Sequence, residues 1–123
     1  MHLYSFEKLE VWIEAKSFAK KIYKITSIFP DTEKFQLISQ LRRASISICS
    51  NIAEGTTRKT YKDQAHFTTM AYGSLIEILN QLILAYELDF ISQEKYSELR
   101  FEVLKLSSNL NSLRKYQISQ TSS

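Results

Sequence analysis

The sequence predicts an all-α protein, folded as an up-down-up-down four-helix bundle. Only two glycines and one proline occur in 123 residues, and a sheet protein of this length needs many more turn residues. Apolar residues recur at spacings of three and four along four long segments, which is the period of an amphipathic helix. The connections between these segments are short, and short connections join antiparallel neighbours.

The first helix is expected to follow Ser5 as its N-cap and to end near Ile28. Pro30 stops it, because the residue before a proline is pushed out of the α region. The apolar face of this helix contains Leu9, Trp12, Ala15, Phe18, Ala19, Ile22 and Ile25. Another face carries three lysines spaced by four, Lys16, Lys20 and Lys24. This lysine face is either a solvated surface or a ridge that contacts phosphates, and the spacing leaves both interpretations open.

The second helix is expected to begin at Asp31 or Thr32, since either residue is a suitable N-cap. Residues 44–48 alternate between apolar and polar types as a strand would, but the surrounding 3.6-residue period favours a helix. Gly55 is placed to end this helix with a positive φ. The expected core face consists of Phe35, Ile38, Leu41, Ile48 and Ile52.

The third helix is expected to start after Thr60, with Asp63 in a capping-box position, and to run to about Leu88. Gly73 in its middle costs about 1 kcal/mol relative to alanine. Close approach of another backbone would offset that cost, so we expect a close contact at Gly73.

The fourth helix is expected to be capped by Ser92. Its core seam steps by three and four through Tyr96, Leu99, Val103, Leu106, Leu110 and Leu113. Residues 1–116 are expected to form one bundle domain. Residues 117–123 are rich in Ser, Thr and Gln, and we expect them to be a disordered tail.

A polar row beside an apolar stripe distinguishes the second helix. Helical spacing places Arg43, Ser47, Asn51 and Glu54 on one face. Glu77 on the third helix is a candidate partner for Arg42 or Arg43, and its loss would then strand a partly buried arginine and weaken folding or assembly. The expected inter-helix or inter-subunit residues are Arg43, Ser47, Asn51, Glu54, Gly55, Gly73, Ser74 and Glu77.

The sequence contains no recognisable catalytic arrangement. A Gly-rich phosphate loop, paired cysteines and a Ser-His-Asp spacing are all missing. His66 follows Asp63 by three residues, but a carboxylate-bundle iron site needs two Glu-x-x-His motifs. Glu54 and Glu77 would suit acid–base chemistry as a buried pair, although ion pairing with arginine is the simpler account. We therefore expect no enzymatic activity, no metal and no cofactor.

The cellular location is expected to be cytoplasmic. Cys49 is the only cysteine, which excludes an intrachain disulfide and fits a reducing compartment. The first residues lack the basic and apolar regions of a signal peptide. No run approaches the 18 apolar residues of a membrane-spanning helix, so we expect no membrane partner.

The charge is unevenly distributed along the chain. The formal net charge is +3, with eleven Lys and Arg against six Asp and Glu in residues 1–62, and five against seven in residues 63–123. A basic half is typical of a protein that binds nucleic acid or an acidic partner. The candidate contacts for RNA or DNA are Lys16, Lys20, Lys24, Arg42, Arg43, Arg58, Lys59 and Lys62. We expect the last five to cluster where the second helix ends and the third begins.

Aromatic residues fall mostly at core positions, so we do not expect Tyr61 or Phe67 to stack on bases. No helix-turn-helix, RNA-recognition or zinc signature accompanies the basic residues. Phosphate contact would therefore be sequence-independent and sensitive to salt. The alternative hypothesis is a protein–protein adaptor with little affinity for nucleic acid.

Two motifs carry a family resemblance. Residues 42–55 read Arg-Arg-Ala-x-x-Ser-Ile-x-x-Asn-Ile-Ala-Glu-Gly, and residues 73–77 read Gly-Ser-x-x-Glu. With Trp12 and Ala15 in the first helix and Phe29-Pro30 before Glu33, this pattern resembles the bacterial 23S rRNA intervening-sequence proteins over roughly residues 6–115.

The resemblance implies a left-handed four-helix bundle that assembles as a ring-shaped homopentamer, without an established enzymatic activity. A related protein is the accessory factor of diversity-generating retroelements, which pairs with a reverse transcriptase and is thought to handle nucleic acid. The resemblance thus leaves both hypotheses in place, a bundle that binds RNA or DNA and a ring that docks a protein partner.

Overall fold

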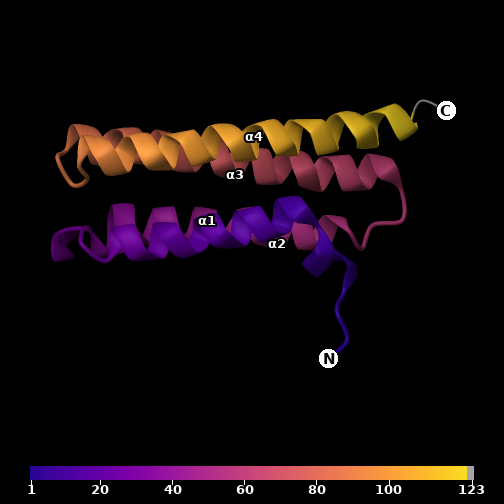
Figure 1. The fold of residues 1–123 in the computed structure, drawn as a ribbon, viewed down its shortest axis with the longest axis horizontal. Helices are drawn as coiled ribbons and strands as arrows, with labels where there is room; N and C mark the ends of the chain where they lie inside the picture. Colours follow the sequence, from indigo (N-terminus) through magenta and orange to yellow (C-terminus); the bar gives the residue numbers. More distant parts are fainter. Residues whose placement is uncertain (122–123) are drawn as a thin grey trace.

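The computed structural model describes residues 1–121, and four antiparallel α-helices account for most of them (Figure 1). These are α1 (Glu10–Thr26), α2 (Ser39–Gly55), α3 (Tyr61–Glu87) and α4 (Gln93–Thr121). No strand occurs within residues 1–121. The predicted all-α, up-down-up-down bundle is therefore confirmed. The N-terminus, the α2–α3 connection and the last turns of α4 lie at the same end of the bundle (Figure 1).

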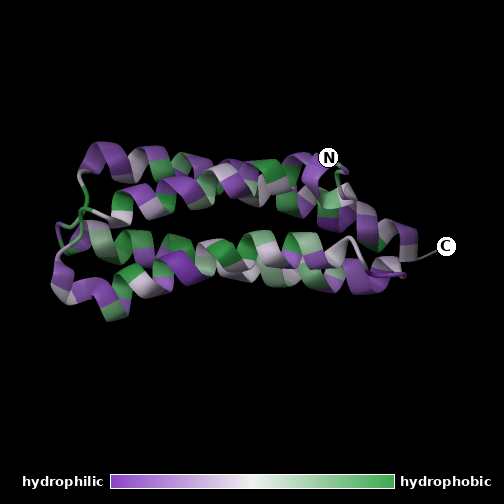
Figure 2. Ribbon diagram, turned by 90° about the horizontal axis from the view of Figure 1, so that it is seen from below, coloured by the Kyte–Doolittle hydropathy of each residue, from purple (hydrophilic) through white to green (hydrophobic). Residues whose placement is uncertain are grey.

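The four helices are not packed equally. α2 packs closely on α1 and on α3, and α3 packs closely on α4, whereas α1 and α4 make few contacts. Hydrophobic and hydrophilic residues alternate along the helices, as amphipathic packing requires (Figure 2). The largest fully buried apolar side chains are Ile22, Leu41, Ile48, Leu75, Ile78, Leu82, Leu106 and Leu110. The bundle thus has one core and is most open along the seam between α1 and α4.

The start of α1 differs from the expectation that Ser5 caps it. Ser5 begins a separate 3-10 turn, Ser5–Lys8, and the backbone N–H of Tyr4, the residue before this turn, donates to Glu7 Oε2 at 2.8 Å. Leu9 follows in an extended conformation and is the residue before α1. At the other end α1 stops at Thr26, because the next three residues tighten into 3-10 hydrogen bonds ahead of Pro30.

The connection between α1 and α2 also differs from the prediction. Neither Asp31 nor Thr32 caps a helix, because a 3-10 turn (Asp31–Glu33) and a π turn (Lys34–Ile38) precede α2. A π turn inserts an extra residue into the helical path and rotates the residues around it. Phe35, predicted in the core, is 86% exposed, and Leu37 is buried in its place.

Two predicted N-caps are confirmed, and the prediction for the C-terminal end of α2 is wrong. Thr60 Oγ1 accepts the backbone N–H of Asp63 at 3.1 Å, and Ser92 Oγ accepts the backbone N–H of Lys95 at 3.2 Å. Gly55, however, is the last residue of α2 and has no positive φ. The positive φ of 64° belongs to Asp89, which closes the α3–α4 turn.

The C-terminal segment is more ordered than its composition predicts. α4 continues through Thr121, and Gln117 is buried against α3, where its Oε1 accepts the hydroxyl of Thr68 at 2.7 Å. The predicted tail is therefore wrong for residues 117–121, because this buried hydrogen bond holds the last turns on the bundle. Residues 122 and 123 lie outside the described part of the chain.

The two glycines have opposite surroundings. A Cβ added to Gly55 would lie 3.1 Å from Cβ of Phe67, so α2 and α3 approach closely there. A Cβ added to Gly73 would meet no atom within 4 Å, so the close contact expected at Gly73 does not exist within the protomer. Gly55 is the glycine required by packing.

This difference predicts opposite responses to alanine. Both substitutions gain about 1 kcal/mol of helix propensity, but Gly55→Ala also overpacks the α2–α3 contact at a cost of about 1–3 kcal/mol. We expect Gly73→Ala to raise the free energy of unfolding of a dissociated subunit. The value for Gly55→Ala is expected to lie about 1–3 kcal/mol below that for Gly73→Ala. Urea unfolding of the two variants checks this, and equal midpoints would show that α2 and α3 are not in close contact at Gly55.

Candidate nucleic-acid interface

The fold converts the uneven charge of the sequence into two differently charged sides. The basic residues 1–62 form α1 and α2, whereas the acidic residues 63–123 form nearly all of α3 and α4. Figure 1 shows α1 and α2 together as one pair and α3 and α4 as the other. The positive charge is therefore gathered on the α1/α2 side of the bundle.

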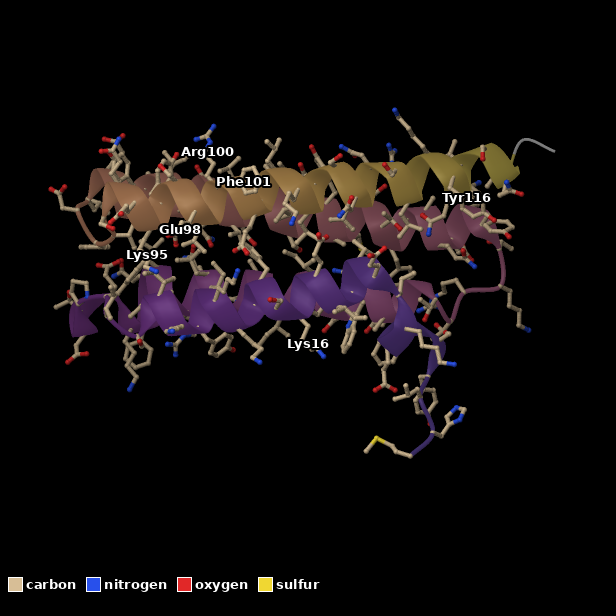
Figure 3. The ribbon with its side chains drawn as sticks, viewed as in Figure 1. Lys16, Lys95, Glu98, Arg100, Phe101 and Tyr116 are labelled. Atoms are coloured by element: carbon tan, nitrogen blue, oxygen red, sulfur yellow. The ribbon has the colours of Figure 1, made fainter. Side chains whose placement is uncertain are left out.

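A shallow groove of about 480 Å³ runs along this side, between α1 and α2. We call it the α1/α2 groove. Its lining consists of Trp12, Lys16, Ala19, Lys20, Tyr23, Ile46 and Cys49. No carboxylate lines it, and Nζ of Lys16 lies 5.0 Å from the centre of the Trp12 ring. Lys16 is on the side of α1 that faces away from α4 (Figure 3).

Arg42 extends the positive charge at the Tyr23 end of this groove. Its Nε donates to Thr26 Oγ1 at 2.8 Å, and its Nη2 donates to the carbonyl oxygen of Tyr23 at 3.3 Å. Its guanidinium lies over the Tyr23 ring, 4.8 Å from the centre. These contacts join α2 to the last turn of α1 and hold the guanidinium in a fixed position.

The predicted basic cluster is divided in the structure. Arg42 and Arg43 lie in the first two turns of α2, and Arg58 lies three residues beyond Gly55, its last residue. About 20 Å of helix therefore separates the two arginines from Arg58. The expectation that they form one cluster is wrong, because α2 is a continuous rod between them. Lys16 and Lys20 line the α1/α2 groove, whereas Lys24 lines a different groove between α1 and α4.

A second basic region lies at the connection between α2 and α3. The guanidinium of Arg58 lies 4.5 Å from the centre of the Phe67 ring, and the carbonyl oxygen of Arg58 accepts a hydrogen bond from Gln64 Nε2 at 3.0 Å. Lys59 and Lys62 are exposed beside it. We call Arg58, Lys59 and Lys62 the α2–α3 corner.

Ser47 of the polar row of α2 contacts α3, which is one of the two contacts expected of this row, with another helix or with another subunit. The hydroxyls of Ser47 and Ser74 form a 2.9 Å hydrogen bond between the two helices. Asn51 Nδ2 donates to the carbonyl oxygen and the hydroxyl of Ser47 at 2.9 and 3.1 Å. Ser47 and Ser74 therefore form an inter-helix contact within the protomer, and Asn51 supports it from within α2.

The charged residues of the same row do not form the expected pair. Arg43 and Glu77 both line a hollow of about 410 Å³ between α2 and α3, together with Gln40, Ala44 and Ser47. Both are exposed, and neither makes an ion pair with any residue of the described chain. The expected ion pair with a partly buried arginine is thus wrong for the protomer, because Arg42 contacts α1 and Arg43 is open to solvent. Glu54 is also exposed, so Glu54 and Glu77 are not a buried carboxylate pair.

Gln81 is a buried polar residue that the sequence pattern did not reveal. It is 3% exposed and lies one turn beyond Glu77 on α3. Its Nε2 donates to Gln40 Oε1 at 3.3 Å, but its own Oε1 has no hydrogen-bond partner. An unpaired buried acceptor of this kind costs about 1–3 kcal/mol.

Cys49 is not poised for nucleophilic chemistry. Burial raises the pKa of its thiol from the ordinary value of 9.0, and this outweighs a backbone hydrogen bond and the charge of Lys16, which both lower it. A raised pKa depletes the reactive thiolate at neutral pH. Its place in the α1/α2 groove is that of a small apolar residue.

Two further kinds of site were sought within residues 1–121, a cluster of metal ligands and a membrane-spanning helix. Nowhere in that range do three His, Cys, Asp or Glu side chains come together as metal ligands would. His66 is exposed and packs edge-on to Phe67. None of the helices there is both long and apolar enough to cross a bilayer.

Comparison with known proteins identifies the fold and the family. The chain resembles a crystal structure of a protein of unknown function from the S23 ribosomal protein family of Bacteroides thetaiotaomicron VPI-5482, with a TM-score of 0.77 and 23% identity over 85% of this chain and 98% of that one. No curated protein matches this chain. Residues 7–112 match the family model described as 23S rRNA-intervening sequence protein. The chain therefore belongs to the family of 23S rRNA-intervening sequence proteins.

Proposed function

We propose that this protein is a non-enzymatic, oligomeric bundle that binds RNA or DNA through its basic α1/α2 side, without a metal or cofactor, in the cytoplasm. The observation that carries the proposal is the α1/α2 groove, whose lining includes Lys16 and Lys20 but no carboxylate. Lys and Arg neutralise phosphates and release the counterions around them. The family name refers to 23S rRNA intervening sequences, which supports a nucleic acid as the partner.

None of the three carboxylates on α1 and α2 lines the groove. α2 contains one carboxylate, Glu54, at its far end. On α1, Glu14 accepts hydrogen bonds from Asn109 Nδ2 at 2.7 and 3.0 Å and so faces α4 instead. Phosphates approaching this side of the bundle would meet cations with little repulsion. The α2–α3 corner supplies further cations at the end of the bundle.

Binding is tested by titrating a labelled structured RNA and a matched duplex DNA into the purified protein at low salt. Fluorescence anisotropy reports affinity, and light scattering on the same sample reports the assembly state. Saturable binding of either nucleic acid supports the proposal. No binding at low salt would mean that the lysines of α1 are a solvated face only.

The same proposal includes self-association. The protein forms a homo-oligomer, and the family resemblance implies that this oligomer is a pentamer. Two features of the α2/α3 surface support it. Arg43 and Glu77 are exposed and unpaired in the protomer. Gly73 has open space above it, although glycine is costly inside a helix. A second subunit on this surface would supply partners for the two charges and pack against Gly73.

Glu77→Ala separates folding from assembly. Because Glu77 is exposed and makes no ion pair in the protomer, its loss is expected to change the free energy of unfolding of a dissociated subunit by less than about 0.5 kcal/mol. We expect the same substitution to reduce the oligomer mass measured by light scattering at micromolar concentration. Glu87→Ala, another exposed carboxylate of α3, is the matched control. If the oligomer mass of Glu77→Ala were unchanged, this surface would not be part of the subunit interface.

A second candidate function is a ring-shaped adaptor without intrinsic affinity for nucleic acid. A groove of about 560 Å³ between α1 and α4 favours it, because Ile25, Ile28, Leu99 and Phe101 give that groove an apolar lining. If this protein is related to the accessory protein of diversity-generating retroelements, which pairs with a reverse transcriptase, its partner would be a polymerase-like enzyme. This function predicts a protein complex that persists at high salt, in contrast to a complex with nucleic acid.

A further inference from the structure

We propose that the α1/α2 groove binds single-stranded nucleic acid, by placing bases against Trp12 and Tyr23 and phosphates against Lys16, Lys20 and Arg42. This inference rests on the proposed function and adds the form of nucleic acid that is bound. The sequence did not predict it, because Trp12 falls on the expected apolar face of the first helix, and Tyr23 belongs to neither that face nor the lysine face. The structure leaves them at the surface, with Tyr23 39% exposed and Trp12 partly buried.

The groove combines the two kinds of contact that a single strand needs. Each aromatic ring has a cation over one face, since Nζ of Lys16 lies 5.0 Å from the centre of the Trp12 ring and the guanidinium of Arg42 lies 4.8 Å from that of Tyr23. A base can stack on an aromatic ring or on a guanidinium plane while the neighbouring phosphate meets the ammonium group. The rings are eleven residues apart on one helix, about 16 Å, which spans more than one nucleotide.

The rest of the lining favours a single strand over a duplex. Ala19, Ile46 and Cys49 also line the groove and provide apolar surface, and Ile46 is 49% exposed. A duplex hides the faces of its bases in the stack and presents mainly phosphates, so it gains nothing from aromatic or apolar groups. Unpaired bases do gain from them, by about 1–3 kcal/mol for each stacked base.

Trp12 makes the proposal directly measurable, because it is the only tryptophan of the chain. The full-length protein is titrated with single-stranded DNA and single-stranded RNA of about 15 nucleotides, a length within the usual site size. The same strand annealed to its complement and the polyanion heparin are the comparison ligands. We expect both single strands to quench Trp12 fluorescence on binding, and the duplex and heparin to bind without quenching it.

Variants of Tyr23 test the second ring. We expect Tyr23→Ala to weaken single-strand binding by about 5-fold to 150-fold, the range that corresponds to one lost stacking contact, and Tyr23→Phe to retain most of the affinity. Tyr116→Ala is the matched control, because Tyr116 is an exposed tyrosine of α4 outside the groove and far from Lys16 along the bundle (Figure 3). Circular dichroism establishes that each variant remains helical.

Three results would overturn the inference in different ways. Equal affinity for single strand and duplex, with Trp12 fluorescence unchanged, would leave phosphate binding in place and exclude stacking in this groove. If no nucleic acid bound at low salt, the result would contradict both the proposed function and this inference. A change in Trp12 fluorescence that follows protein concentration, without any oligonucleotide, would assign the groove to a contact between subunits.

Discussion

Leu82→Ala is expected to lower the free energy of unfolding by about 2–5 kcal/mol, the range for truncating a fully buried leucine. Leu82 is 0% exposed and lies in the C-terminal third of α3, the helix that packs on both α2 and α4. Its removal leaves a cavity that rigid neighbouring helices cannot fill. For a domain whose total stability is about 5–15 kcal/mol, the loss is a large fraction. Urea unfolding at one fixed protein concentration measures it.

Leu104→Ala is the matched control for this substitution. Leu104 is 65% exposed on α4, and truncation there is expected to change stability by less than about 0.5 kcal/mol. A midpoint that falls as far for Leu104→Ala as for Leu82→Ala would mean that α3 and α4 are rotated relative to the packing described above.

The double substitution Lys16→Glu with Lys20→Glu is expected to weaken binding of a structured RNA about tenfold or more at low salt. The two lysines line a groove without carboxylates, so both phosphate contacts are lost and two repulsive charges replace them. The salt dependence should also become shallower, by about 0.9 in slope for each phosphate contact removed. Anisotropy titrations of the helical, correctly assembled variant measure both effects.

The control for this charge reversal is Lys105→Glu with Lys115→Glu. Both lysines are exposed on α4, outside the α1/α2 groove, and the pair changes the formal charge by the same amount. We expect this variant to keep most of the affinity of the unaltered protein. If the two double variants lost affinity equally, net charge would govern binding and the α1/α2 groove would have no special part in it. A third variant with Arg58→Glu and Lys59→Glu measures the contribution of the α2–α3 corner.

Helical periodicity predicted the parts of the fold that depend on a regular repeat. The α4 seam through Leu99, Val103, Leu106 and Leu110 is buried as expected, because every step of three or four residues returns to the same face. Thr60 and Ser92 were recognisable as caps because each hydroxyl satisfies a backbone N–H that the helix leaves unpaired. Local chemistry was sufficient for these features.

Irregular backbone could not be predicted in the same way. The π turn before α2 moves Phe35 to the surface and Leu37 into the core, and no residue type specifies such a turn. Gly55 illustrates a second difficulty, since a glycine at a helix end serves either a positive φ or a close contact. The sequence favoured the first, and the distance to Phe67 establishes the second.

The sequence predicted which basic residues belong to the candidate interface but not how the fold arranges them. Arg42 and Arg43 are adjacent in sequence, yet neighbouring residues of a helix point about 100° apart. Arg42 therefore reaches α1, whereas Arg43 lines the hollow between α2 and α3. Trp12 matched the core pattern, yet it lines the surface groove between α1 and α2 together with Tyr23. Such differences depend on how helices pack, which spacing alone does not determine.

The most direct test of the central claim is the salt dependence of RNA binding by the unaltered protein. The affinity is measured at about 50 mM and about 200 mM salt with one labelled structured RNA. If three phosphates are neutralised on the α1/α2 side, the dissociation constant should rise about 40-fold between these concentrations. An affinity that does not change with salt, or no binding at the lower concentration, would contradict the assignment of this side as a nucleic-acid interface.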